Sequence, residues 1–392
     1  GIFGVLIVSC DMFYRDADWG MLILMLGVVT MLLGAVLGLF SVNLKRTLAC
    51  SSMSQIGFIL VGVGMQGLLG AHNQLAVYGT VLHMINHSLI KLILFVIAGV
   101  IFTRVGSLDL NEIRGWGRGK PLVMFCFFMA AVGVGGIPLW SGYISKTLLH
   151  ESIVEYIEIL SAQGGAGLMR TVEWLFLIAG GMTLAYMTKL FVAVFLEKKP
   201  GSEKPAKELY MDKPTSVMLT VCGALLLVFG LFAHSTMDHI AEVSRSFLGG
   251  EALEHAVQYF SWTNLQGALI SLAIGAVLYF GVVRLLLMKK DAQGVRIYVD
   301  RWPRWADLEK LVYRPLLSGL AFVGAFCSRT VASLADWIIA LVNRLFYKKA
   351  PQSVEPKTNE QFGAYSDKPV HRGIVGETLA YELLLYGAGV VA

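Results

Sequence analysis

The sequence predicts an all-α fold, a polytopic bundle of transmembrane helices with one discontinuous helix and a long amphipathic lateral helix. The first reason is composition: 56% of the 392 residues are hydrophobic, 15% are charged, and the mean hydropathy is +0.66. Average soluble domains carry roughly 25% charged residues. The second reason is that several apolar runs exceed about 18 residues, which is long enough for a helix to cross a bilayer.

The apolar runs set the order of the predicted elements. A short apolar segment at 1–10 comes first, and spans are predicted at 19–40, 48–69, 75–102, 121–149, 172–196, 215–234 and 263–288, with another beginning near 373. We therefore expect a transmembrane bundle at 1–235, an additional transmembrane helix with loops at 236–302, the amphipathic helix at 303–349, a linker at 350–369, and the start of a final transmembrane helix at 370–392. Because the first segment is too short to cross and the last stops at Ala392, we expect a C-terminal fragment of a longer chain.

The predicted span at 121–149 contains the discontinuity. Its sequence "GVGGIPLWSG" places Gly133, Gly135, Gly136, Pro138 and Gly142 within ten residues. A broken membrane helix frees backbone amides and carbonyls, which must then line a cavity or pack against protein. Lys146 follows this break directly, so we expect it to lie on an ion path.

The segment at 303–349 is too polar for a clean span. Apolar residues recur there at steps of three and four residues, and most polar residues fall on the other side. We expect an amphipathic helix that lies along the membrane surface. The alternative is that residues 315–347 form one or two transmembrane spans.

The charges of the loops predict the orientation of the bundle. One set of loops is rich in lysine and arginine, and we name it the basic side: 41–47, 103–120 and 198–213. The only lysine or arginine residues in the opposite loops are Arg15, Arg170 and Arg245. The positive-inside rule places the basic side in the cytoplasm. We expect a multi-pass protein of a bacterial or archaeal cytoplasmic membrane.

The span at 75–102 carries three proton-binding side chains. In "LHMINHSLIKLILF", His83, His87 and Lys91 are each four residues apart. On a helix they share one face, about 6 Å apart along the axis. Histidine titrates near neutral pH and can accept a proton on one nitrogen while it donates from the other. Steps of this length need bridging waters. A buried histidine pair that only stabilises the core is the alternative.

Two more lysines lie near the ends of apolar runs. Lys45, followed by Arg46, lies next to a basic loop and on its own would anchor a helix end. Lys189 lies about two turns from a basic loop, so we expect it to extend to the interface and to tolerate substitution by alanine.

The sequence gives no sign of a cofactor or metal site. The five cysteines are scattered without a CxxC pair, and no nucleotide-binding glycine motif is present. We expect no cofactor and no metal in this chain, no redox chemistry of its own, and no nucleic acid partner.

Three motifs in order, "LKRTLACSSMSQIGF", "HMINHSLIKLILF" and "GIPLWSGYISK", resemble the antiporter-like subunits of respiratory complex I. The same family includes subunits of multisubunit cation/proton antiporters and of energy-converting hydrogenases. The resemblance covers most of residues 1–235. The lateral helix and the extra final span resemble the large distal member of the family.

The resemblance implies two five-helix inverted repeats, each with a broken helix, and a central line of lysines and histidines. It implies that Lys45 is the central lysine of the second half-channel, that His83, His87 and Lys91 are the connecting relay, and that Lys146 is the exit-side lysine. Thr147 follows Lys146 where the family often has an acidic residue, and the segment "SLDLNEIRGWGRGKP" differs from the usual linker.

We therefore expect a proton-translocating subunit of a redox-driven complex of the NADH:quinone oxidoreductase type. Its partners would be the lipid bilayer and other membrane subunits, including sister antiporter-like subunits contacted by the lateral helix. A subunit of a hydrogenase or formate hydrogenlyase, or of a multisubunit Na⁺/H⁺ antiporter, is the alternative. A stand-alone antiporter and a membrane scaffold are two further hypotheses.

Overall fold

The computed structural model describes residues 1–198, 210–248, 257–290, 296–303, 307 and 309–346. The chain forms two units, Gly1–Arg301 and Trp302–Ala392, which are described separately. The linker predicted at 350–369 and the final helix predicted at 370–392 lie outside the described residues.

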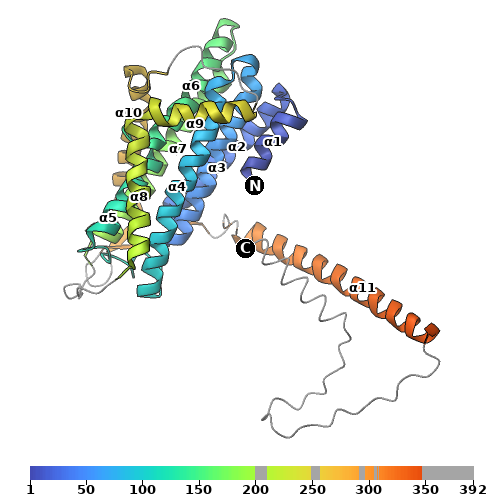
Figure 1. Ribbon diagram of the computed structural model, residues 1–392. Coiled ribbons are helices and arrows are strands. Elements are labelled where there is room, and N and C mark those ends of the chain that lie inside the picture. The colour runs from blue at the N-terminus through green and yellow to red at the C-terminus, as the bar shows by residue number, and fades with distance from the viewer. Residues whose placement is uncertain (199–209, 249–256, 291–295, 304–306, 308, 347–392) are drawn as a thin grey trace. The chain divides into compact units, whose positions relative to one another are not determined.

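The first unit is a bundle of helices (Figure 1). Its helices are α1 (Ile2–Ile7), α2 (Ala17–Phe40), α3 (Leu44–Leu69), α4 (Gln74–Val105), α5 (Pro121–Gly135), α6 (Ser141–Ala162), α7 (Gly167–Phe191), α8 (Lys213–Leu231), α9 (Ala233–Leu248) and α10 (Trp262–Val277). Wider π-helical turns extend three of these helices at Val8–Met12, Val192–Leu196 and Leu278–Leu286, and a 3₁₀ turn at Gly70–His72 follows α3.

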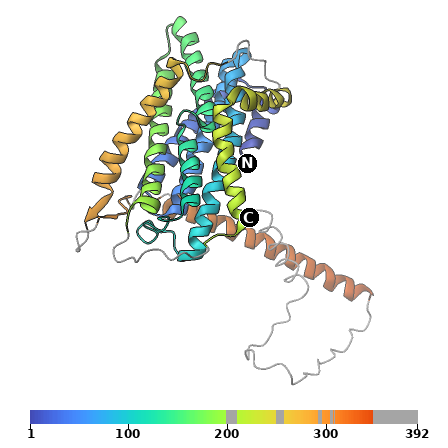
Figure 2. The same cartoon turned by 60° about the vertical axis from the view of Figure 1, so that its left-hand side comes forward.

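The predicted class, a polytopic bundle of transmembrane helices, is confirmed. Within the described residues, seven helical segments are long and apolar enough to cross a membrane. Two elements were not predicted. Helix α9 lies largely between the spans predicted at 215–234 and 263–288, where loop was expected, and runs across α4 and α8 (Figures 1 and 2). Strands β1 (Met288–Lys290) and β2 (Arg296–Tyr298) form a short antiparallel ribbon in which Lys289 pairs with Ile297.

Local sequence signals fix several helix ends. The carboxylate of Asp16 accepts hydrogen bonds from the backbone N–H groups of Asp18 and Trp19 at the start of α2. Asn43 caps α3 by accepting from the N–H of Arg46 at 3.1 Å. These side chains satisfy donors that have no partner inside the helix. At the C-terminal end of α4, Gly106 adopts the left-handed conformation that terminates many helices.

The predicted discontinuous helix is present. Helix α5 ends at Gly135 and α6 begins at Ser141, and residues 136–140, which we name the helix break, join them. Gly136 has a φ of 74°, and Leu139 has a φ of 79°, which is uncommon for a residue with a side chain. The two helices overlap at the break, because a Cβ atom on Gly142 would lie 1.9 Å from the carbonyl oxygen of Gly133. Only glycine permits this approach of α6 to α5.

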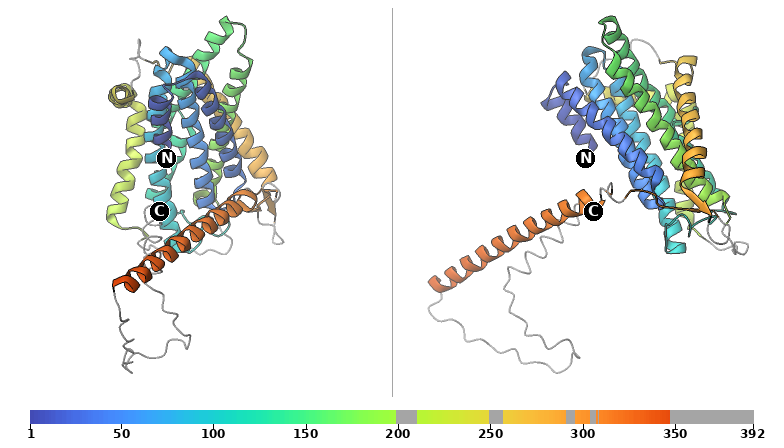
Figure 3. Two further views of the ribbon diagram at one scale, coloured as in Figure 1. Left: turned by 90° about the vertical axis from the view of Figure 1, so that its right-hand side faces the viewer. Right: turned by 180° about the vertical axis from the view of Figure 1, so that it is seen from behind.

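Glycines also allow α2 and α3 to pack along their length, as Figure 3 shows. A Cβ atom on Gly34 of α2 would lie 2.4 Å from the backbone nitrogen of Ser54 in α3. A Cβ atom on Gly57 of α3 would lie 2.3 Å from the backbone nitrogen of Met31 in α2. Small residues of this kind bring membrane helices together by backbone contact.

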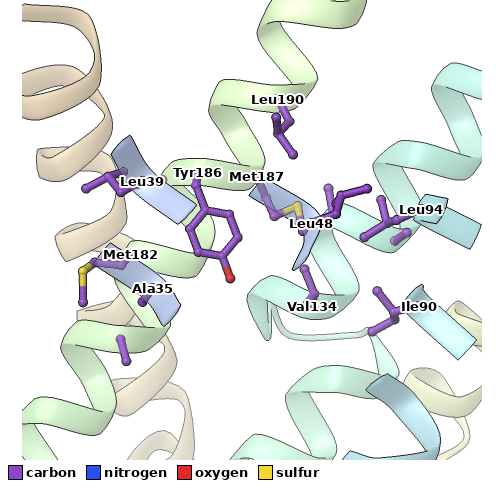
Figure 4. Packing of buried hydrophobic residues seen from close by; sticks show 14 of the residues in the cluster. Ala35, Leu39, Leu48, Ile90, Leu94, Val134, Met182, Tyr186, Met187 and Leu190 are labelled. Carbon is purple, nitrogen blue, oxygen red and sulfur yellow. The ribbon is translucent and has the colours of Figure 1, made fainter. Parts of the chain in front are cut away.

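The core between α2, α3, α4 and α7 is apolar except for a few side chains. Figure 4 shows the ring of Tyr186 among buried residues that include Leu39, Met182 and Met187. The Tyr186 hydroxyl is buried with the ring. Since a buried hydroxyl needs a hydrogen-bond partner, this tyrosine indicates polar groups inside the bundle.

The second unit contains α11 (Arg314–Phe346), preceded by a π-helical turn at Glu309–Tyr313. The predicted long amphipathic helix is therefore present, over 33 residues. None of its side chains described between 314 and 342 is buried. The segment Leu311–Val342 is also apolar enough to span a membrane by length and composition. Its location along the membrane surface stays a prediction.

The glycine contact between α2 and α3 gives a stability prediction. Gly57→Val should lower the free energy of unfolding by about 1–3 kcal/mol, because the new side chain has no room against Met31. Gly99→Val is the matched control, since a Cβ atom on Gly99 has no heavy atom within 4 Å. Thermal unfolding in detergent measures both variants. Equal melting temperatures for the two would contradict this packing.

Candidate functional site

Polar side chains from α3, α4, α6 and α7 meet in the middle of the bundle. Nδ1 of His83 in α4 lies 3.0 Å from the hydroxyl of Ser145 in α6. Nε2 of His83 lies 3.1 Å from Oε1 of Gln55 in α3. All three side chains are buried. Because the amide oxygen only accepts, the contact with Gln55 places the proton of the neutral imidazole on Nε2 and leaves Nδ1, beside Ser145, as the accepting nitrogen.

The hydrogen bonds continue from Gln55 towards α7. Nε2 of Gln55 donates to the hydroxyl of Thr183 at 3.4 Å. The Tyr186 hydroxyl lies 3.2 Å from the Thr183 hydroxyl and donates to the Ser51 hydroxyl at 2.9 Å. We name these hydrogen-bonded groups the central polar cluster: Ser51, Gln55, His83, Ser145, Thr183 and Tyr186.

His87 and Lys91 continue the face of α4 that carries His83. Nε2 of His87 is buried and has no hydrogen-bond partner among the described residues, so it can bind a water molecule. The Lys91 side chain is 6% exposed, and its Nζ donates to the carbonyl oxygen of Leu48 in α3 at 2.9 Å. Electrostatic interactions couple His83 to His87 and His87 to Lys91. The structure therefore brings the three predicted relay residues into one line.

Lys146 reaches the same region from α6. Its side chain is 8% exposed, and Nζ donates to the carbonyl oxygen of Val134 at 2.8 Å. Val134 lies in the last turn of α5, where backbone carbonyls lack helical partners and carry partial negative charge. Nζ also lies 4.7 Å from the centre of the Phe58 ring. The helix break thus holds the ammonium group beside His83, with which it interacts electrostatically.

The expectation that Lys189 extends to the interface is wrong. Its side chain is 1% exposed, and Nζ donates to the carbonyl oxygens of Gly38, Leu39 and Ser41 at 2.7–3.1 Å. These carbonyls end α2, so the ammonium group neutralises the negative end of that helix dipole. The sequence showed the distance to the loop but not that the end of α2 would lie over the side chain.

The structure does not place Lys45 in the line formed by His83, His87 and Lys91. Lys45 is the second residue of α3, and its side chain is exposed on the surface of this chain. Its neighbour Leu44 is the residue that points into the core. The resemblance implied that Lys45 is the central lysine of the second half-channel, but the first turn of α3 turns this side chain outwards, away from His83, His87 and Lys91.

Sequence reasoning missed the uncharged members of the central polar cluster. Gln55 and Ser145 stand inside motifs that were recognised for their charged residues. Thr183 and Tyr186 precede Lys189 by about two turns and one turn on α7. Polar residues on one face of an apolar helix, spaced by three residues, are the signal that could have found them.

The described residues contain no group of three or more histidine, cysteine, aspartate or glutamate side chains that could hold a metal ion. The line consists of titratable and hydrogen-bonding side chains inside a helix bundle. This combination of fold and site defines the class of the protein as a polytopic membrane protein with a line of titratable side chains inside its helix bundle.

Comparisons with known proteins agree with this class. Residues 1–172 match the protein family described as "NADH:quinone oxidoreductase/Mrp antiporter, TM". Hydrogenase-4 component B of Escherichia coli is 27% identical over 258 residues, which cover 63% of this chain and 38% of that protein. One Na⁺/H⁺ antiporter subunit of Alkalihalophilus pseudofirmus is 25% identical over 335 residues, which cover 81% of this chain and 40% of that protein. The resemblance to antiporter-like membrane subunits is therefore confirmed.

A solved structure supports the fold. A chain of the Mrp complex from Dietzia sp. aligns with a TM-score of 0.57 at 23% identity, over 87% of this chain and 36% of that chain. This likeness shows the shared fold alone. The chain spans about two fifths of the length of the two relatives named above.

Because Lys189 is buried, we no longer expect its substitution to be tolerated. Lys189→Met should lower the free energy of unfolding by about 1–3 kcal/mol, because the buried carbonyls that end α2 would lose their donor. The exposed Lys213 offers a matched control in Lys213→Met. Thermal unfolding in detergent is the measurement. A Lys189→Met protein as stable as the control would refute the capping role.

Proposed function

We propose that this chain translocates protons as one membrane subunit of a larger complex. The observation that carries the proposal is the line of buried groups that joins Lys146, His83, His87 and Lys91 across α6 and α4. A buried ammonium group loses much of its hydration and can release its proton. Neutral histidines next to it can accept that proton and pass it on through water.

The expected direction of transfer follows from the loop charges. We propose that the basic side faces the cytoplasm, as the positive-inside rule predicts. Lys91 would then exchange protons with the cytoplasmic half of the bundle, and Lys146 with the opposite half. His83 connects the two, because its Nδ1 faces α6 and its helix carries His87 and Lys91.

We propose that the parent complex is driven by redox chemistry in other chains and is of the NADH:quinone oxidoreductase type. The description of the matching family includes this type. The alternatives are a hydrogenase or formate hydrogenlyase and a multisubunit Na⁺/H⁺ antiporter, and the named relatives support these two. In each case the partners would include sister membrane subunits, with α11 as the proposed contact.

Mass spectrometry of the chains that co-purify with this protein distinguishes the alternatives. A complex I assembly should contain iron–sulfur and quinone-binding subunits, a hydrogenase should contain a nickel–iron subunit, and an antiporter should contain membrane subunits alone. Recovery of the protein as a single chain that exchanges cations for protons would contradict the proposed complex.

Lys91 and His87 test the relay along α4. Lys91→Ala and His87→Ala should each reduce proton translocation at least ~10-fold, since a positioned proton-transfer group typically contributes roughly 10²–10⁴-fold. Assembly should change little, since the helix itself stays intact. Lys45→Ala is the control, because its side chain is exposed. Proton uptake by vesicles, normalised to the amount of assembled complex, is the measurement, and wild-type uptake in both relay variants would exclude the relay.

Lys146 tests the role of the helix break. Lys146→Ala should abolish most proton translocation, because no other amine is held by the end of α5 in the described residues. Lys146→Arg should also be poor, since a guanidinium group does not release its proton. Both variants are measured in the same vesicle assay. Normal translocation by Lys146→Arg would show that the charge of this residue is needed and its proton exchange is not.

A further inference from the structure

A small cavity lies next to Lys146, on the side of α6 that faces α7 and α10. Its volume is about 40 Å³, and its walls include Lys146, Thr147, His150, Phe176, Asn264 and Ser271. This volume is sufficient for one water molecule, and the walls offer the polar partners that a buried water needs. The cavity therefore gives the Lys146 side of α6 a place for a proton-carrying water.

His150 is part of the wall of this cavity. It lies four residues after Lys146, so the two side chains share a face of α6, about 6 Å apart along the axis. The imidazole lies against the Phe176 ring at a centroid distance of 6.0 Å. Its Nδ1 edge faces Gly267 of α10, where a Cβ atom would lie 3.3 Å from Nδ1. Gly267 thus leaves room at this nitrogen, which has no hydrogen-bond partner among the described residues.

The other nitrogen of His150 contacts an acidic residue on the next helix. Nε2 lies 3.2 Å from Oε1 of Glu173 in α7. The Glu173 side chain is 26% exposed, against 15% for His150, so the carboxylate leads towards the surface. Glu173 lies in the second turn of α7, at the end of the bundle away from the basic side.

The other titratable groups near the cavity are already engaged. Glu151 accepts a hydrogen bond from Nδ2 of Asn264, and the Tyr143 hydroxyl donates to the carbonyl oxygen of Tyr259. Arg170 interacts electrostatically with Glu173 from the first turn of α7. The pair of His150 and Glu173 links the wall of the cavity to a partly exposed carboxylate.

We propose that His150 and Glu173 form the exit for protons that leave Lys146, an inference that rests on the proposed function. The ammonium group of Lys146 gives a proton to water in the cavity, and that water gives one to Nδ1 of His150. Nε2–H of the resulting imidazolium then passes its proton to the Glu173 carboxylate. Glu173 releases the proton to solvent, and the neutral histidine exchanges its ring proton before the next transfer. Each step moves one proton. After the release Lys146 is neutral, and a proton delivered from His83 restores its ammonium group and the starting charge of the chain.

The test uses His150→Gln and Glu173→Gln in the assembled complex in vesicles. Each should slow proton translocation roughly 10-fold or more, since the substituted amides do not exchange protons at neutral pH. The matched controls are His239→Gln on α9 and Glu158→Gln on α6, whose side chains are exposed. These two should translocate protons like the unchanged protein. Wild-type rates in His150→Gln and Glu173→Gln would overturn the exit.

A second measurement separates proton transfer from packing. Replacing the imidazole in His150→Ala enlarges the cavity, and imidazole added to the vesicles should restore at least part of the lost translocation. A loss that imidazole does not restore, together with normal translocation by Glu173→Gln, would assign His150 a packing role and overturn the proposal. Lys146→Ala tests the proposed function separately from the exit. Normal proton translocation by this variant would contradict the proposed transfer along Lys146, His83, His87 and Lys91. If Lys146→Ala is defective while His150→Gln and Glu173→Gln translocate normally, the proposed function is supported and the proposed exit through His150 and Glu173 is wrong.

Discussion

The cost of burying an ammonium group inside a membrane protein governs this structure. Each of the three buried lysines in the described part of the chain meets that cost with backbone carbonyls of another helix: Lys146 at the end of α5, Lys189 at the end of α2 and Lys91 at Leu48. A helix C-terminus provides acceptors and partial negative charge without an acidic side chain. Carbonyl partners stabilise the charge less completely than a carboxylate would. We infer that they leave Lys146 and Lys91 able to exchange protons.

The glycines that break and pack the helices make these contacts possible. Gly136 and Gly142 let α5 end inside the bundle with α6 beside it, so the freed carbonyl of Val134 points at Lys146. The close packing of α2 on α3 places Ser51 and Gln55 opposite α7 and α4. Backbone geometry thus positions the side chains that exchange protons, and the same geometry limits how much water enters.

The sequence alone predicted the class of fold, the helix break and the relay face of α4, because helical spacing and apolar length are local properties. His83, His87 and Lys91 share a face whatever surrounds them. The burial of Lys189 and the exposure of Lys45 could not be predicted in this way, since both depend on which helix end lies against the side chain. Helix α9 was missed because only one of its faces is apolar, so its sequence lacks the continuous apolar run that marks a transmembrane helix. The roles of Gln55 and Tyr186 follow from contacts between helices distant in sequence.

The central claim is that partners across helices set the proton-accepting state of His83. Gln55→Met tests it most directly, because it removes the acceptor for Nε2–H of His83 and keeps the volume of the side chain. Gln66→Met, another buried glutamine of α3 outside the central polar cluster, is the control. We predict that proton translocation by the assembled complex falls strongly in Gln55→Met and stays near normal in Gln66→Met. Equal translocation by the two variants would contradict it.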